Sequence, residues 1–277
     1  MERILGPKDY NDTKITDLKI EKRLDLAYLG TLFIVIRFAY VALVTNRRTL
    51  MDKKLANKTD DRHELDVQYL LKNPVEMKLI EMAELCLDQF NLNRRSALIV
   101  LQCTFMLRLY YMFGPEHGDG ADGGDSQVIN GLMVQMALAI GLHRDGSVVT
   151  NVNDIISDSI EECVAEEDSA RVQNLHRKIW FFLVICDLIQ GYQYGNPLCI
   201  REEMYDTRLP FYQPGNENID DIEKEKHAVS TFAYLEKYRT KLVNILNTCL
   251  NLHKPANLKT LTGYISDFEV FLNDNFG

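Results

Sequence analysis

The sequence predicts an all-α fold, a single large multi-helix domain over residues 1–277. Helix-forming residues dominate, and the regularly spaced strand and turn signals of an all-β protein are lacking. Apolar residues make up 46% of the chain, which is enough for a sizeable core. Only 15 residues are glycine and 7 are proline, which argues against long disordered tracts.

Three helices are predicted in the first part of the chain. The first runs from about Asp17 to Val44. The second begins at residue 73, where Asn73 can cap a helix and Pro74 suits its first position. The third covers residues 94–113, is apolar on most sides as expected of a central helix, and ends at a Gly-Pro pair.

The first helix also raises the question of a membrane. Residues 26–44 are long and apolar enough to cross a bilayer. Arg37 lies near the centre of this segment, where an unpaired charge costs roughly 2.5–3.5 kcal/mol on insertion. We therefore favour a buried helix of a large helical domain, and we expect no membrane partner.

More helices are predicted in the second part of the chain. One runs from Gln127 to about Ile140, and Gly141 suits its C-terminal turn. Its small residues, Gly131 among them, predict a helix that neighbours approach closely and bury on nearly all sides. Residues 171–200 pass from basic to strongly apolar around Trp180 and end in a Gly-Asn-Pro turn.

The helical period returns at about Asp220 and lasts until Pro255, and a last helix covers residues 258–277. This last helix shows little sign of a finishing cap. We therefore expect a chain that is truncated at its ends.

Charge and cysteine content exclude several classes of protein. The formal net charge of −9 makes the average surface repel nucleic acid and anionic lipid. Seven acids fall within residues 154–168, which predicts a solvated loop or an exposed amphipathic helix. The six cysteines form no C-x-x-C pair, so neither a zinc framework nor a disulfide scaffold is indicated, and most are expected to be reduced core residues of an intracellular protein.

The loop of residues 118–126 carries four glycines and three aspartates before a helix. Glycines at such a place can cradle a phosphate, but three aspartates without a lysine would repel it. Asp119, Asp122 and Asp125, with His117, are candidates for a weak metal site, although their spacing is not that of a calcium-binding EF-hand loop. A tight connector whose glycines take positive φ, with Asp125 and Ser126 capping the next helix, explains the composition better.

The tripeptide His143-Arg144-Asp145 is found in the catalytic loop of protein kinases. Thr150 stands where a kinase needs asparagine, and no glycine-rich strand or D-F-G accompanies it. Signatures of serine hydrolases and zinc proteases are absent as well. We therefore interpret these residues as a helix C-terminus, where a cation can meet free carbonyl groups.

Asp187 lies inside an apolar helical segment and is expected to be buried. An isolated buried charge is very costly, so this carboxylate needs a partner. We predict that Arg144 or Arg177 pairs with Asp187 and locks two helices together.

Three linked stretches resemble the middle homology region of fungal transcription factors of the zinc binuclear cluster class. They are GDSQVINGLMVQMALAIGLHRDG, RKIWFFLVICDLIQGYQYGNPLCI and REEMYDTRLP, in this order, and the match is clearest over residues 94–212. Ile140 and Asn196 depart slightly from the pattern. The matching positions include Gly141, His143, Arg144, Asp145, Arg177, Trp180, Asp187, Gly195, Pro197 and Pro210.

The resemblance implies a regulatory, all-helical domain that is not an enzyme, with these residues in structural roles. In the family a separate N-terminal cluster of six cysteines holds two zinc ions and reads DNA. Zinc and DNA contact are therefore implied only for a longer parent protein, and no cofactor is expected in this chain. The implied partners are the transcription machinery or co-regulators in the nucleus, a second copy of the chain, and a small apolar effector that some members bind.

Two other functions stay open on the sequence. One is a scaffold or dimerisation protein that keeps the fold without binding DNA and docks through the acidic residues 154–168. The other is a helical, lipid-modifying enzyme with its first helix at a membrane. The sequence gives this enzyme no recognisable catalytic constellation.

Overall fold

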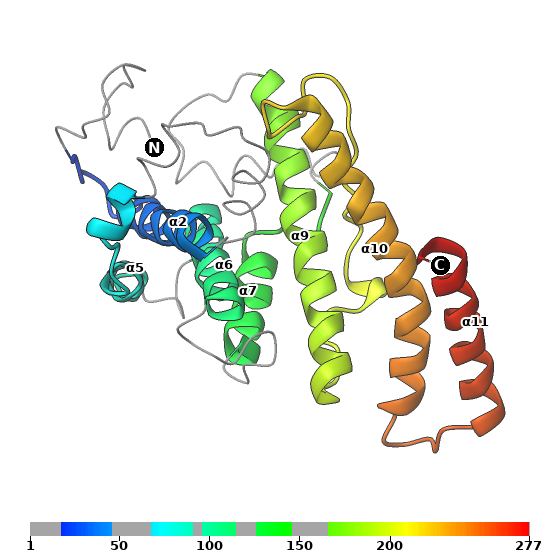
Figure 1. Cartoon of the computed structure of the whole chain (residues 1–277). Coiled ribbons are helices and arrows are strands. Elements are labelled where there is room, and N and C mark those ends of the chain that lie inside the picture. Colours follow the sequence, from blue (N-terminus) through cyan, green and yellow to red (C-terminus); the bar gives the residue numbers. More distant parts are fainter. Residues whose placement is uncertain (1–17, 46–67, 91–95, 115–125, 146–165, 277) are drawn as a thin grey trace, which may run out of the picture. The chain divides into compact units, whose positions relative to one another are not determined.

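The computed structural model describes residues 18–45, 68–90, 96–114, 126–145 and 166–276 (Figure 1). Helices dominate these residues, and no strand occurs among them, which confirms the predicted all-α class. The chain divides into two compact units, Met1–Ile129 and Asn130–Gly277, and we describe each by itself. The single domain over residues 1–277 stays a prediction.

The first unit contains α2 (Asp25–Thr45), α5 (Lys78–Asp88) and α6 (Leu98–Phe113), and each of these helices contacts the other two (Figure 1). They approach closely at Gly30 of α2. A Cβ atom on this residue would lie 3.0 Å from Sγ of Cys103 and 3.3 Å from Cβ of Cys86. The missing side chain of Gly30 therefore lets α5 and α6 pack against α2.

Arg37, which the sequence presents as an unpaired charge, has partners inside this unit. It is buried, its Nε donates to the hydroxyl of Tyr110 at 3.3 Å, and its Nη1 donates to the carbonyl of Val75. By length and composition α2 is the one helix in the described part of the chain that is suited to cross a membrane. In its most apolar stretch of 18 residues, 28% is buried. Core helices of soluble proteins meet the same criterion, so the absence of a membrane partner stays a prediction.

The three predicted helix starts in this unit are wrong: the third helix begins at Leu98, after an extended Ala97, and not at residue 94. The first helix begins at Asp25, not at Asp17, because residues 18–24 are not helical. The second begins at Lys78, since residues 68–72 form a separate helical stretch and residues 74–76 are not helical. Asn73 does not cap α5: its side-chain amide donates 3.0 Å back to the carbonyl of Tyr69. Pro74 disfavours helical backbone at the residue before it, so it follows a helix here instead of opening one.

The second unit takes in most of α7 (Ser126–Ala139) together with α9 (Glu166–Tyr194), the 3-10 turn η2 (Glu202–Met204), α10 (Ile222–Cys249) and α11 (Leu258–Phe276). Helices α9 and α10 pack together, and α11 returns along α10 (Figure 1). Leu188 of α9 and Leu242 and Leu246 of α10 form a buried cluster between them. The helices predicted from about residue 220 and over residues 258–277 are thus present, although α10 ends at Cys249 and not at Pro255.

Helix α7 is less buried than its small residues predict. Val128 is 78% exposed, and Gln135 and Ala139 are exposed too. A Cβ atom on Gly131 would meet no described atom within 4 Å, so this glycine does not mark a close approach. The prediction that α7 is buried on nearly all sides is therefore wrong.

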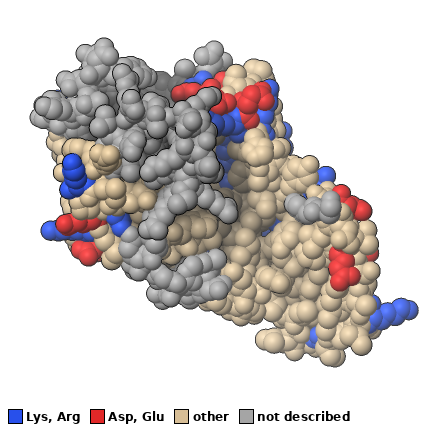
Figure 2. All heavy atoms as spheres, viewed as in Figure 1, with Lys and Arg blue, Asp and Glu red and all other residues tan. Residues whose placement is uncertain are grey.

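Charged side chains of both signs gather near the start of α10 (Figure 2). There Asp221 caps the helix, because its Oδ1 accepts the main-chain N–H of Lys224 at 3.2 Å. Side-chain pairs three residues apart, Lys224 with Asp221 and Lys226 with Glu223, add exposed ion pairs. Positive and negative charges therefore alternate here and form no continuous positive face.

Candidate functional site

A glycine turn ends α7 and leads into the His-Arg-Asp tripeptide. Gly141 has a φ of 81°, its N–H donates to the carbonyl of Leu138, and the N–H of Leu142 donates to that of Ala137. This is the Schellman arrangement, in which a glycine in the left-handed region lets the last carbonyls find donors. The C-terminal turn predicted at Gly141 is confirmed.

Asp145 is the centre of a buried ionic cluster. Its carboxylate is 1% exposed and accepts Nε of Arg177 at 3.3 Å and Nη2 at 2.8 Å. It also accepts the main-chain N–H of Arg208 at 3.1 Å and Nε of this residue at 2.7 Å. The carboxylate of Asp145 thus joins the end of α7 to α9 and to residue 208. It forms ion pairs with both arginines, and its oxygen atoms accept further hydrogen bonds.

The segment of residues 205–216, which we call the strap, is joined to the end of α7 by further bonds. The Asp206 carboxylate accepts the N–H of Asp145 at 2.9 Å and pairs with Arg144 at 3.0 Å. Its own N–H donates 3.1 Å to the carbonyl of His143, and the Thr207 hydroxyl donates 2.7 Å to that of Leu142. We call this set the clamp. Its members are Arg144, Asp145, Arg177, Asp206, Thr207 and Arg208.

Trp180 is fully buried in this unit, close to His143 and the strap. Its ring meets Tyr205 edge to face at 5.5 Å between centroids and lies 6.2 Å from the ring of His143. Burial lowers the pKa of His143, and the neighbouring Arg144 lowers it further against the opposing effect of Asp206. Among the described residues, Nδ1 of His143 and Nε1 of Trp180 have no hydrogen-bond partner. The contacts described for the two rings are therefore those between aromatic groups.

The predicted pairing of Asp187 with Arg144 or Arg177 is wrong. Arg177 contacts Asp145 and Arg144 contacts Asp206, whereas Asp187 accepts the N–H groups of Cys199 at 3.2 Å and Ile200 at 2.9 Å. Main-chain donors satisfy a buried carboxylate as a cation does. Burial raises the pKa of Asp187, and these two N–H groups oppose the rise. Its role is to hold the chain as it returns along α9.

The Gly-Asn-Pro turn makes this return possible. Gly195 has a φ of 70°, and Pro197 is exposed at the turn. Gly191, which the sequence reasoning missed, lies one turn earlier: a Cβ there would be 2.7 Å from Cδ2 of Leu198 and 3.3 Å from the carbonyl of Asn196. An isolated glycine inside a helical pattern was the available signal for this contact. Pro210 is buried in the strap.

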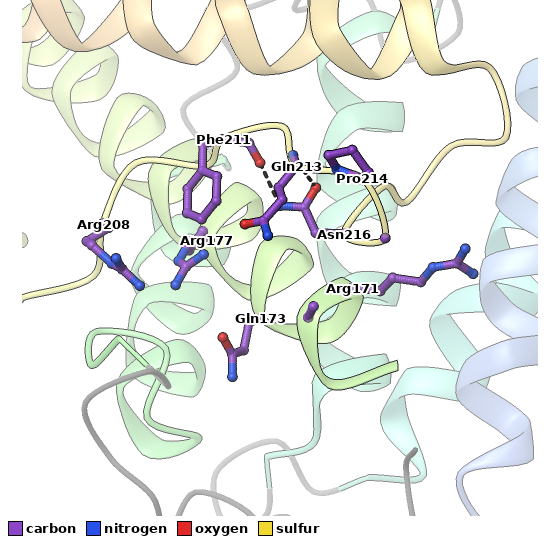
Figure 3. Close-up of a pocket in the computed structure, with 10 residues that line it drawn as sticks. Arg171, Gln173, Arg177, Arg208, Phe211, Gln213, Pro214 and Asn216 are labelled. Carbon is purple, nitrogen blue, oxygen red and sulfur yellow. Dashed lines mark hydrogen bonds between the residues drawn. The ribbon is translucent and has the colours of Figure 1, made fainter. Parts of the chain in front are cut away.

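A pocket of about 710 Å³ lies between α9 and the strap (Figure 3). Sequence reasoning missed it, because its strap residues come from an irregular stretch without a periodic pattern. Phe211 packs under two guanidinium groups, at 5.0 Å from Arg177 and 5.9 Å from Arg208. The lining residues are Ala170, Arg171, Gln173, Arg177, Arg208, Phe211, Gln213, Pro214, Gly215 and Asn216.

The proposed metal ligands of the glycine loop, residues 117–125, lie outside the described residues. Within the described ranges no group of three or more His, Cys, Asp or Glu side chains could hold a metal ion. Cys86, Cys103 and Cys186 are buried, and Cys199 and Cys249 are exposed. Burial raises the pKa of Cys103 to about 11, so it is an unreactive core thiol.

The fold and the clamp define an all-helical protein whose motif residues join helices to an irregular strap. Residues 43–262 match the family model described as the fungal specific transcription factor domain. The chain therefore belongs to this family, and its resemblance to the middle homology region of fungal zinc-cluster regulators is confirmed.

Several transcription regulators of yeasts are similar to this chain. Multidrug resistance regulator 1 of Candida albicans is 34% identical over 277 residues, covering 99% of this chain and 24% of that protein. Multidrug resistance regulator 2 of the same yeast is 26% identical over 50% of this chain and 17% of its own length. Oleate-activated transcription factor 1 of Saccharomyces cerevisiae is 20% identical over 90% of this chain and 23% of its own length.

The chain thus spans at most 24% of the length of these relatives. No solved structure matches it.

Proposed function

We propose that this chain is the regulatory domain of a longer fungal zinc-cluster transcription factor, acting in the nucleus through contacts with the transcription machinery or co-regulators. The observation that carries the proposal is the family match over residues 43–262. In this proposal DNA contact and zinc belong to another part of the parent protein. The similarity to a multidrug resistance regulator across 99% of the chain supports a role in controlling transcription.

The clamp supports a structural role for the motif rather than a catalytic one. Asp145 stands where a kinase has its catalytic base, but here it is 1% exposed and engaged by two arginines. A general base must reach the proton that it abstracts. A carboxylate held in this way is therefore suited to joining helices and not to proton transfer.

The predicted apolar effector receives no support from the two pockets described in the second unit. The larger is lined by three arginines and three amide side chains as well as by apolar residues such as Phe211 and Pro214, and a smaller one of about 260 Å³ is lined mostly by polar residues of the α10–α11 region. Apolar effectors favour pockets with mainly apolar walls. We therefore propose regulation through protein contacts and leave the apolar effector as a prediction.

A reporter assay tests the proposed function. The 277-residue chain is inserted between a heterologous DNA-binding domain and an activation domain, and reporter transcription in yeast is compared with that of a fusion carrying a flexible linker of equal length. A regulatory domain changes reporter output severalfold at equal protein level, and Asp145→Asn, which opens the clamp, reverses the change. Lys259→Gln, an exposed change in α11, serves as the matched control and should leave output as in the unchanged fusion.

Equal output from the chain and the linker would reject the regulatory role. It would then favour the scaffold alternative, which predicts docking without an effect on transcription.

A further inference from the structure

The turn between α10 and α11, with the helix ends beside it, forms a basic surface that shares no residue with the clamp. We propose that this surface binds an extended acidic peptide, in which a carboxylate contacts Lys254 and the main chain contacts the amides of Asn244 and Asn247. The inference deepens the proposed function and rests on it for the kind of partner, an acidic segment of a protein that the domain contacts.

The charge of this region is opposite to that of the chain as a whole. Residues 237–266 contain five lysines or arginines and no aspartate or glutamate, although the formal net charge of the chain is −9. They cover the last part of α10, the turn and the first part of α11 (Figure 1). Salt screens charges more than about 10 Å away at 0.1 M, so the local charge decides what this surface attracts.

Two of the five cations already have partners. Arg239 pairs with Glu236 at 2.6 Å, and the ammonium group of Lys237 lies 5.7 Å from the ring centre of Tyr234. Lys254 is exposed and forms no ion pair with any residue that the structure describes. Its charge is therefore available to a partner.

A groove of about 260 Å³ lies at this end of the two helices. Its walls come from the end of α10, the turn that follows and Tyr264 of α11. None of its lining residues is an aspartate or glutamate, and Lys254 is the only lysine or arginine among them. Small-molecule sites enclose roughly 300–1,000 Å³, so a smaller groove suits a side chain of a segment that crosses it. The lining residues are Asn244, Asn247, Thr248, Asn251, Lys254, Pro255, Ala256 and Tyr264.

Two asparagine amides on α10 are available to bind the main chain of a peptide. Asn244 and Asn247 lie three residues apart and so share a face of the helix. Both are exposed, and neither side chain has a hydrogen bond within the described ranges. An amide donates and accepts, as the N–H and C=O groups of an extended chain require. Asn251 fixes the turn beside them, because its Oδ1 accepts the N–H groups of His253 at 3.0 Å and Lys254 at 3.1 Å.

The same surface is less suited to nucleic acid. Proteins that bind duplex DNA tightly contact about 6–10 phosphates, whereas this groove offers one lysine. Single strands stack their bases on aromatic side chains. Tyr264, the one aromatic residue of the lining, is half-buried. Amides beside a single cation therefore match a peptide with spaced carboxylates better than a continuous row of phosphates.

Fluorescence anisotropy with the full 277-residue chain tests this site at a fixed salt concentration of about 0.1 M. The probe is a labelled peptide of alternating glutamate and serine, about ten residues long, because an extended chain of this length spans about 30 Å. The same peptide with glutamine for glutamate is the neutral control, and a single-stranded oligonucleotide of equal charge is the nucleic-acid control. We expect saturable binding of the acidic peptide and at least about tenfold weaker binding of both controls.

Three variants place the binding in the groove. Lys254→Gln removes the contacting charge, and Asn247→Asp replaces an amide by a repelling carboxylate of similar size. Each should weaken binding of the acidic peptide about fivefold, the effect of one exposed ion pair. Lys259→Gln is the matched control, because it removes an equal charge from α11 outside the lining of the groove. It should change the affinity less than about twofold.

Thermal unfolding shows whether each variant is folded, and Asn247→Asp decides the question if Lys254→Gln is not. No binding of the acidic peptide, or equal binding of the neutral peptide or the oligonucleotide, would overturn the proposal. An equal loss in all three variants would show attraction by charge alone and overturn the proposed groove. Reporter output is measured separately, so a failure of peptide binding leaves the regulatory role standing, and equal output from chain and linker leaves the peptide site standing.

Discussion

At the scale of single residues, the carboxylate of Asp145 is the group whose loss should matter most to stability. Asp145→Asn would leave Arg177, with 5% of its side chain exposed, as a buried cation without an ionic partner. We expect the free energy of unfolding to fall by about 3–5 kcal/mol. Urea unfolding followed by the fluorescence of Trp180 measures this, because Trp180 is the only tryptophan of the chain and lies fully buried in the same unit.

Asp206→Asn is the matched control for this measurement. It removes the ion pair with Arg144, but both side chains are about half exposed, and an amide oxygen can still accept the N–H of Asp145. Exposed ion pairs contribute little, so a loss of less than about 1 kcal/mol is expected. Equal losses in the two variants would contradict the distinction between a buried and an exposed carboxylate.

His176 of α9 should make the protein sensitive to acid. Burial lowers its pKa from 6.5 to about 4 in the folded chain, so unfolding takes up a proton between these values. Its contribution to stability is present above pH 6.5 and is lost as the pH falls toward 4. At about pH 5, His176→Gln should lower proton uptake on unfolding by about one proton, measured from the slope of unfolding free energy against pH. An unchanged slope would show that His176 is accessible to protons in the folded state.

The sequence predicts which residues of the site have a structural role better than it predicts the groups that they contact. Gly141 could be placed at a helix end because local chemistry decides such a turn. Asp187 was rightly expected to need a partner, but its donors are main-chain N–H groups that no side-chain pattern displays. Asp145 and Arg208 are 63 residues apart in the sequence. From the sequence alone, several other cations of the chain were equally good candidates to pair with Asp145, and only the fold shows which ones do.

At the scale of elements, periodicity located the helices well and their starts less well. Helix α10 begins close to its predicted start, because apolar residues at spacings of three and four mark the buried face and Asp221 caps the start, but it ends at Cys249 and not at Pro255. Pro74 led to a wrong start for α5, because proline occurs before a helix as well as in its first turn. The strap has no period at all, and it supplies three of the six clamp residues and six of the ten residues that line the pocket.

Two glycines of the second unit give a paired test at this scale. Gly191→Ala in α9 would bring a methyl group 2.7 Å from Leu198 and 3.3 Å from the carbonyl of Asn196. We expect a loss of about 1–3 kcal/mol from this overpacking. Gly131→Ala in α7 meets no described atom within 4 Å and should instead stabilise by about 0.5–1 kcal/mol, because alanine favours a helix. Melting temperatures that shift in the same direction would contradict the close approach at Gly191.

At the scale of the whole molecule, net charge predicts that this chain does not bind DNA by itself. The charge is −9, and the positive side chains near the start of α10 lie beside negative ones (Figure 2). Phosphate contacts need a positive surface that releases counterions. Gel-shift assays with duplex DNA should therefore show no retardation at any salt concentration. Retardation that weakens with added salt would reveal a basic surface and contradict this expectation.

The clamp also affects how freely this protein can change in length over evolution. Arg177 and Asp145 are 32 residues apart in the sequence, so their contact closes a ring of the chain. This ring contains residues 146–165. The entropy of closing such a ring grows only slowly, by about 0.6 kcal/mol for each doubling of its length. Insertions and deletions inside the ring should therefore change the entropy of closing it only slightly, as long as Arg177 and Asp145 stay joined.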